Sequence, residues 1–160
     1  MRECLVLLAV WLGFFQVATF AHGNNQDKDH HKNDEKRMMS DQEIEDRLRD
    51  IIKKEVIIPT EYQGGLQLIG AEPKGRMVEY TYVNKTVEAR GAKDYFNALE
   101  KNALPVLETM FCKTEQFTWY RQQKVSMSWR YQASDRSDVA LVTCQQEETC
   151  KCNIKNLSEK

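Results

Sequence analysis

The sequence predicts an α+β domain in which a four-stranded antiparallel sheet carries helices on one face. Three observations lead to this fold class. Apolar residues recur at helical spacing in two segments, β-branched and aromatic residues fill four shorter runs, and turn-forming residues separate the strands of each pair. Because each strand pair is connected locally and each helix has one apolar stripe, we expect the order helix, strand, strand, helix, strand, strand.

A capping box marks the start of the first helix. Ser40 is followed three residues later by Glu43, the spacing at which a hydroxyl and a carboxylate satisfy the free amide groups of a helix start. The helix should end near Glu55, because the β-branched residues 56–58 and then Pro59 favour an extended chain. Its apolar stripe consists of Ile44, Leu48, Ile51 and Ile52.

The first strand pair is predicted at residues 66–70 and 77–83, separated by the turn 71–75, which is rich in helix and strand breakers. One face of the second strand carries alternate large residues, Val78, Tyr80 and Tyr82. We expect the two tyrosines to belong to the core and not to a platform that stacks a ligand.

The main core helix is predicted at residues 92–111. Pro105 lies in its middle, where it removes a hydrogen bond and crowds the carbonyl of Lys101, so the helix must kink or divide there. Residues 114–123 lack a clear period and are expected to form a short helical turn or loop packed on the domain. The apolar stripe of the helix consists of Phe96, Leu99, Ala103, Leu107 and Met110.

The clearest strand is residues 125–131, because every odd position is large and apolar or aromatic and every even position is polar. One face of this strand should therefore be buried and the other solvated. The turn 133–138 connects it to a second apolar strand at residues 139–144. Residues 147–160 are expected to fray as a polar C-terminal tail.

The N-terminus is typical of an export signal. Arg2 precedes an apolar run at residues 4–20 with a small-x-small cleavage site at its end, so residues 1–21 are predicted to be a signal peptide and not a short transmembrane helix. Residues 22–39 have almost no apolar side chains and are predicted to be a disordered polar leader. Residues 40–146 then form a single domain. We expect a periplasmic location, with extracellular secretion as the alternative.

Four cysteines follow the predicted signal peptide, an even number that favours disulfides in an exported chain. We predict a disulfide between Cys112 and Cys144, because Cys150 and Cys152 are too close in sequence for an easy bridge to each other. That last pair would be free, joined under strain or linked to another chain. A metal site made of Cys144, Cys150 and Cys152 is the alternative, although an oxidising compartment removes the thiolates that it would need.

Charge and residue distribution argue against several functions. The formal net charge is −1, so neither nucleic acid nor an anionic membrane surface is favoured as a partner. All three histidines lie in the leader: His22, His30 and His31. The predicted domain therefore lacks the usual general base at neutral pH. It has scattered glutamates, which we expect to be solvated, among them Glu79, Glu88, Glu100 and Glu108. We predict no enzyme, no cofactor and no metal; a carboxylate-dependent hydrolase would need two acids facing one cleft.

A few positions resemble those of small exported bacterial domains of uncharacterised function with a cystatin-like layout. They are the aromatic strand Tyr80-Thr81-Tyr82, a helix ending at Cys112, the strand Trp129-Arg130-Tyr131 and a closing strand ending at Cys144. The resemblance covers about residues 56–145 and implies a periplasmic location and this fold, but no activity. The Gln-x-Val-x-Gly and Pro-Trp loops of inhibitory cystatins do not occur in the sequence, so inhibition of cysteine proteases is not implied.

These observations favour a non-enzymatic binding or accessory protein of the cell envelope, with another protein as its partner. The predicted contact surface combines the solvated face of strand 125–131 with two aromatic residues before it: Ser126, Ser128, Arg130, Trp119 and Tyr120. The alternative is a redox or metal-handling protein that works through Cys150 and Cys152. The sequence leaves the partner and the oligomeric state open. Asn84 and Asn156 match the N-glycosylation pattern and are expected to be unmodified surface positions.

Overall fold

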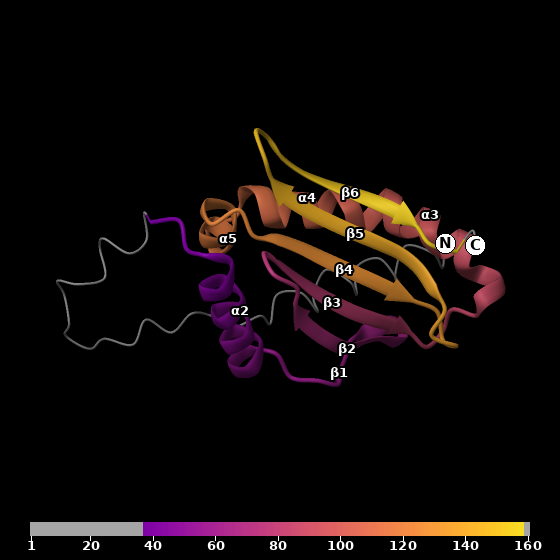
Figure 1. Ribbon diagram of the computed structural model, residues 1–160. Helices are drawn as coiled ribbons and strands as arrows, with labels where there is room; N and C mark the ends of the chain where they lie inside the picture. The colour runs from indigo at the N-terminus through magenta and orange to yellow at the C-terminus, as the bar shows by residue number, and fades with distance from the viewer. Residues whose placement is uncertain (1–36, 159–160) are drawn as a thin grey trace.

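A six-stranded sheet is the framework of the computed structural model, which describes residues 37–158 (Figure 1). Its strands lie side by side in chain order: β1 (Thr60–Glu61), β2 (Leu66–Pro73), β3 (Met77–Asn84), β4 (Ser126–Gln132), β5 (Asp138–Gln146) and β6 (Cys150–Asn156). The predicted signal peptide and residues 22–36 of the predicted leader lie outside the described residues. The α+β class is confirmed, but the prediction of four strands is wrong.

The two middle strands, β3 and β4, run parallel, whereas every other neighbouring pair is antiparallel. A parallel pair needs a crossover connection, and residues 85–125 supply one that carries several helices. The prediction of an entirely antiparallel sheet is therefore wrong as well. The sequence indicates two locally connected strand pairs, but it does not show which strands of the two pairs meet or in which direction.

The predicted C-terminal tail contains an edge strand, which corrects the expectation that it frays. β6 pairs with β5 along its whole length. Its residues alternate in direction, so Cys152 and Ile154 pack against the core while lysine and asparagine lie between them. At its outer edge the backbone N–H of Cys152 donates to Glu108 Oε2 of the helical layer at 3.2 Å. A helix side chain thus covers part of the sheet edge.

Helix α2 (Asp41–Glu55) begins and ends where the sequence predicts. Ser40 Oγ accepts a hydrogen bond from the backbone N–H of Glu43 at 3.3 Å, and the Glu43 carboxylate accepts one from the backbone N–H of Ser40 at 2.7 Å. The hydrogen bonds from the Ser40 backbone and hydroxyl lower the pKa of Glu43 to about 2. Ile44 and Leu48 are buried in the hydrophobic core.

The long helix predicted at residues 92–111 is divided, as its proline requires. α3 (Ala92–Ala98) continues into a π-helical segment (Leu99–Ala103) and then into α4 (Leu104–Lys113). Pro105 is the second residue of α4 and directly follows the π-helical segment, so the helix accommodates the missing N–H by a local change of winding and does not end there. The expected short helical element follows as α5 (Thr118–Gln122). Within the described residues, no helix is long and apolar enough to cross a membrane.

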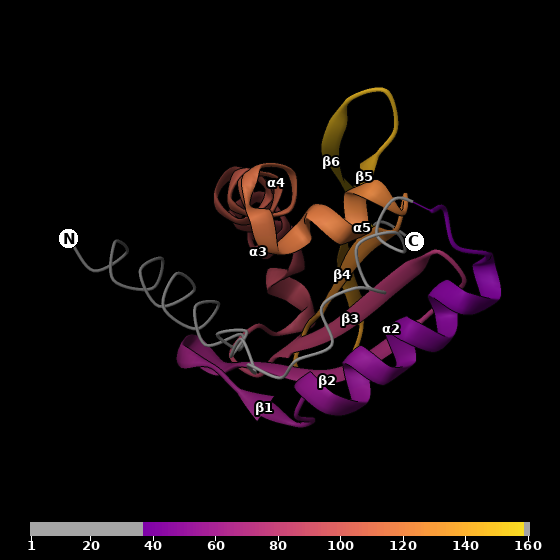
Figure 2. The same ribbon diagram turned by 90° about the vertical axis from the view of Figure 1, so that its left-hand side faces the viewer.

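One hydrophobic core lies between the helices and the sheet. Figure 2 shows α3 and α4 stacked against one face of the sheet. The odd positions of the predicted strand 125–131 are all buried there, as expected: Val125, Met127, Trp129 and Tyr131. The rings of Tyr82 and Tyr131 stack with centroids 5.7 Å apart, and Tyr80 packs against the same core. Both tyrosines of the predicted pair are therefore part of the core.

Two of the last three residues of the predicted leader, Arg37 and Met39, are hydrogen-bonded to the domain, so the expectation of disorder up to residue 39 is wrong. The buried side-chain amide of Gln123 accepts from the backbone N–H of Met39 at 2.8 Å and donates to the Arg37 carbonyl at 2.9 Å. Arg76 donates to the carbonyl of Met39 at 2.5 Å. These side chains supply the partners that an extended backbone segment would otherwise lack.

All four cysteines in the described residues form disulfides, but not in the predicted pairs. Cys112 is bonded to Cys150, and Cys144 is bonded to Cys152, so the predicted bond between Cys112 and Cys144 is wrong. The physical reason is the unforeseen strand β6. Its pairing with β5 places Cys152 directly opposite Cys144, and its first residue, Cys150, then lies beside the end of α4.

Candidate functional site

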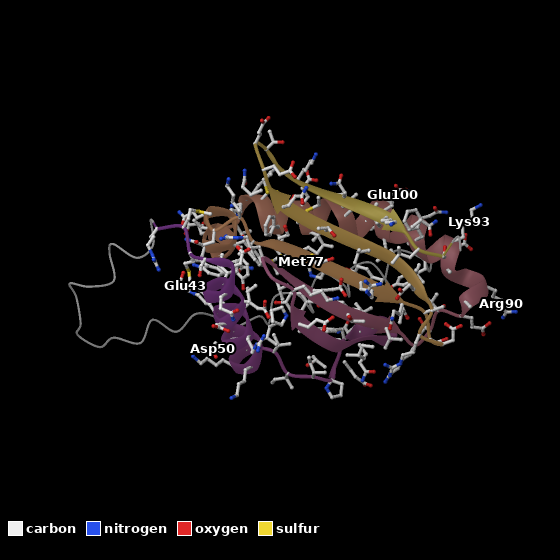
Figure 3. All side chains as sticks on the ribbon, viewed as in Figure 1. Glu43, Asp50, Met77, Arg90, Lys93 and Glu100 are labelled. Atoms are coloured by element: carbon white, nitrogen blue, oxygen red, sulfur yellow. A yellow bond between two sulfur atoms is a disulfide. The ribbon has the colours of Figure 1, made fainter. Side chains whose placement is uncertain are left out.

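The face of the sheet that points away from α3 and α4 is the candidate functional site, and we call it the open face. Figure 3 looks onto this face, with Met77 labelled on it. Strand alternation and the register of β3, β4 and β5 place polar side chains on it at neighbouring positions, including Glu79, Ser128, Arg130 and Thr143. Met77, Val83 and Leu141 fall on the same face, so the open face is mixed in polarity, with charged and hydroxyl side chains at its centre, whereas the opposite face is apolar.

A network of ion pairs holds together the centre of the open face. Arg130 on β4 donates to both carboxylate oxygens of Glu79 on β3, at 3.1 and 3.4 Å, and to Asp138 Oδ2 on β5 at 2.7 Å. Lys74 Nζ, in the turn between β2 and β3, lies 2.9 Å from Glu79 Oε1. The network therefore joins three adjacent strands and one turn. Gln132 extends it by donating to Asp138 at 2.9 Å.

Glu79 is the only charged side chain among residues 37–158 that is buried, with 5 % of its side chain exposed. Burial opposes ionisation, but the hydrogen bonds from Arg130 and Lys74 outweigh it, so the pKa of Glu79 is lowered below its ordinary value. The carboxylate is thus ionised and fully paired. The expectation that Glu79 is one of several solvated glutamates is wrong.

Arg130 lies at the centre of this network, with 26 % of its side chain accessible, less than Lys74 at 40 % and Asp138 at 36 %. The hydrogen bonds to Glu79, together with the charge of Asp138, raise the pKa of Arg130 above its ordinary value. Two carboxylates from different strands hold the guanidinium in one orientation. Because that orientation is already fixed, a partner that contacts Arg130 loses little side-chain entropy on binding.

Ser128, predicted to be part of the solvated face, is fully buried. Its hydroxyl lies 3.2 Å from both the Val142 carbonyl and Thr143 Oγ1 on β5. Ser128 therefore ties β4 to β5 and offers no contact to a partner, which corrects its place in the predicted surface. Ser126, at the start of β4, is half-buried and can contribute.

Trp119 and Tyr120, the aromatic half of the predicted surface, lie away from the ion-pair network. Both are on α5 and pack against the hydrophobic core. Arg47 of α2 lies 4.5 Å from the centroid of the Trp119 ring, and burial raises the pKa of Tyr120 to about 12. The predicted five-residue surface is therefore wrong as a unit, because its aromatic residues belong to the packing between helices and sheet.

Sequence reasoning missed Glu79, Lys74 and Asp138 as functional candidates. Glu79 stands between Val78 and Tyr80 in a strand whose alternate positions are large and apolar or aromatic, but alternation alone does not distinguish a buried carboxylate from a solvated one. Its burial depends on Arg130, which is 51 residues further along the chain and adjacent only because β3 and β4 pair in parallel. No local pattern carries that information.

The cysteine pair of the alternative function is not free. Cys150 and Cys152 each bond to a different cysteine, so neither is an available thiol or thiolate in this structure. Among residues 37–158, no group of three or more histidine, cysteine, aspartate or glutamate side chains is arranged to hold a metal ion. The redox or metal-handling alternative depended on Cys150 and Cys152 being available as a neighbouring pair, and both are engaged in other bonds.

A shallow depression of about 380 Å³ lies where β3 leads into α3. Its charged lining residues are Glu88, Arg90 and Asp94, and Arg90 is 86 % exposed and paired with Glu88 at 2.7 Å. Asn84, one of the two glycosylation-pattern asparagines, is nearby in the chain and accepts hydrogen bonds from Thr86. None of the residues that line this depression is both charged and buried, so it has no fixed ion-pair network like that of the open face.

Comparisons with known proteins give one structural match. No protein-family model matches the chain, and no curated protein matches it. The crystal structure of a "putative secreted protein" from Pseudomonas aeruginosa is similar, with a TM-score of 0.50 and 11 % sequence identity over 71 % of this chain and 90 % of that one. At this identity the likeness concerns the fold alone. The cystatin-like layout stays a prediction.

Proposed function

We propose that this chain is an exported, non-enzymatic binding protein of the cell envelope that docks another protein on the open face. Three observations support export: the predicted signal peptide, the pairing of all four described cysteines, and a structural neighbour whose name is "putative secreted protein". The periplasm is the simplest destination, and extracellular secretion is the alternative.

The ion-pair network around Arg130 is the observation that carries the binding role. Arginine is enriched among the residues that dominate protein interfaces, and fixed side chains bind with a smaller entropic cost. Arg130 is such an arginine: its side chain is partly exposed, and Glu79 and Asp138 hold its guanidinium in place. The surrounding hydroxyl and amide side chains would form the polar rim that such a contact needs.

A protein is a better partner for this surface than a small molecule or nucleic acid. The open face is a sheet surface, and the depression described above is shallow and lies at the β3–α3 connection. The balanced charge of the chain gives no extended basic surface for phosphates. A polar face that centres on one oriented arginine suits a protein surface carrying carboxylates or carbonyl groups.

The test is quantitative capture from envelope extracts with immobilised mature protein. Arg130→Gln removes the oriented guanidinium, and Arg90→Gln is the matched control, because it removes the same charge from a highly exposed site outside the network. We expect one or more proteins to be enriched by wild type and by Arg90→Gln, and depleted about tenfold or more by Arg130→Gln.

Because Arg130 also supports the sheet, a second variant separates docking from folding. Asn153 on β6 is exposed on the open face, opposite Thr143, and is outside the network. Asn153→Arg should keep the melting temperature and reduce capture by adding bulk to the surface. An identical set of captured proteins for wild type and both open-face variants would contradict the proposal.

Export is tested separately, by expressing the full-length chain and sequencing the N-terminus of the protein recovered outside the cytoplasm. We expect the mature chain to begin near His22 and to contain no free thiol. Recovery of the intact chain, reduced and in the cytosol, would contradict export without deciding the binding role.

A further inference from the structure

The two disulfides have different positions in the fold. Cys144–Cys152 lies within the sheet, between residues that are directly opposite each other on β5 and β6. Cys112–Cys150 joins the last turn of α4 to the first residue of β6. Within residues 37–158 it is the only disulfide that connects the helical layer to the sheet.

The two disulfides also differ in their access to solvent. Cys144 is 0 % exposed and Cys152 is 7 % exposed, so a reagent cannot reach their bond without local opening. Cys112 and Cys150 are both half-buried, and the turn before Cys150, residues 147–149, is exposed throughout. Thiol exchange requires access to a sulfur atom, so the second disulfide is the one that a reductant meets first.

The backbone protects the two disulfides to different degrees. Seven pairs of residues hold β5 against β6, so Cys144 and Cys152 stay opposite each other even if their bond is open. Cys112 and Cys150 are not held by a shared ladder, and their bond closes a sequence separation of 38 residues, against 8 for the other. Opening Cys112–Cys150 therefore changes the structure more than opening Cys144–Cys152.

We propose that Cys112–Cys150 is a thiol-exchangeable disulfide whose reduction by a dithiol releases the start of β6 from α4, while Cys144–Cys152 stays closed. The dithiol is a protein or small-molecule reductant with two neighbouring thiols. One of its thiolates attacks a sulfur of the pair, forms a mixed disulfide and expels the other cysteine as a thiolate. Its second thiol then breaks the mixed disulfide. The dithiol is oxidised to its own disulfide, and Cys112 and Cys150 end as two protonated thiols.

The released segment is limited by the contacts that remain. The Glu108 carboxylate still accepts the backbone N–H of Cys152, and the β5–β6 ladder is intact. The turn 147–149, Cys150 and the end of α4 lose their covalent anchor, and Cys150 and Lys151 are then held only by their pairing with Gln146 and Gln145 at the end of the ladder. Lys151 belongs to the open face by strand alternation, so reduction alters one edge of that surface. This inference depends on the positions and solvent exposure of the two disulfides, and it does not require the proposed binding role.

The test is graded reduction of the oxidised mature protein with dithiothreitol, followed by alkylation and peptide mass spectrometry. We expect Cys112 and Cys150 to be labelled about tenfold or more faster than Cys144 and Cys152, because the rate of exchange depends on access. Hydrogen exchange of the half-reduced protein should rise at residues 112–116 and 147–151 and stay unchanged in β3 and β4.

Two pairs of substitutions complete the test. Cys112→Ser with Cys150→Ser should reproduce the local rise in hydrogen exchange, whereas Cys144→Ser with Cys152→Ser is the matched control and should leave the end of α4 protected. If either double variant fails to fold, the order in which the cysteines of the unmodified protein are labelled still tests the proposal. Labelling of Cys144 and Cys152 first, or of all four cysteines together, overturns the proposal.

Discussion

The two faces of β4 are both buried near the middle of the strand, but by different means. On the face toward the helices, Met127, Trp129 and Tyr131 are covered by apolar contacts. On the open face, Ser128 and its neighbour Glu79 are covered as well, but each is held by hydrogen bonds or ion pairs. Apolar burial tolerates any partner of the right shape, whereas polar burial requires particular partners, so substitutions and pH should affect the two faces differently.

The largest expected effect is on the apolar face. Trp129→Ala removes a side chain that is 2 % exposed, and we expect it to lower the free energy of unfolding by about 3–5 kcal/mol, measured by urea denaturation at pH 7. Trp119→Ala is the control, because Trp119 is half-buried and its removal should lower the free energy of unfolding by less. An equal or smaller loss for Trp129→Ala would mean that β4 is not the centre of the core.

The next effect is on the open face. Glu79→Gln leaves Arg130 and Lys74 without their shared carboxylate, and we expect a loss of about 1.5–3 kcal/mol in the free energy of unfolding. Arg130→Gln and the double variant complete a double-mutant cycle. The cycle should show coupling, with the double variant less destabilised than the sum of the two single variants. Additive losses would show that the ion pair contributes no stability.

The contribution of Glu79 should also depend on pH. Its folded-state pKa is lowered below the ordinary value of 4.5, so its stabilisation is present above that value and is lost as the pH falls through the folded-state pKa. The difference in unfolding free energy between wild type and Glu79→Gln should therefore shrink on acidification below about pH 4.5. The loss caused by Trp129→Ala should stay constant over the same range. A pH-independent difference for Glu79→Gln would mean that its carboxylate is not held in the ionised form.

The smallest effect is that of the buried hydroxyl. Ser128→Ala leaves Thr143 Oγ1 and the Val142 carbonyl with one partner fewer, and we expect a loss of about 0.5–1.5 kcal/mol in the free energy of unfolding. Ser126→Ala, on the same face but half-buried, should be close to neutral. Equal losses of unfolding free energy for the two substitutions would show that the hydrogen bonds of the Ser128 hydroxyl to β5 do not stabilise the sheet.

Sequence reasoning predicted the elements that are determined by residues close together in the chain. The period of two in residues 125–131 gave β4 and its buried face, the capping box gave the start of α2, and Pro105 gave the division between α3 and α4. Each of these depends on neighbouring residues or on residues a few positions apart. They are also the elements for which backbone chemistry alone restricts the alternatives.

The features that could not be predicted depend on distant pairings. The parallel contact of β3 with β4 crosses about forty residues, and the partners of Glu79 follow from it. β6 was missed because its inward positions include Cys150 and Cys152, which count weakly as apolar residues, and the disulfides followed that error. For the candidate site, Arg130 is the one predicted surface residue that lies in the network, because the period of two places it on the solvated face of strand 125–131.

The order of the strands in the sheet is also the order in which the chain is synthesised. β1, β2 and β3 can therefore assemble as a meander as soon as residue 84 has emerged, and β4, β5 and β6 can do so in their turn. A single long-range event, the docking of one meander against the other along β3 and β4, then completes the molecule. The ion pair between Glu79 and Arg130 crosses that junction and can close only when both halves are present.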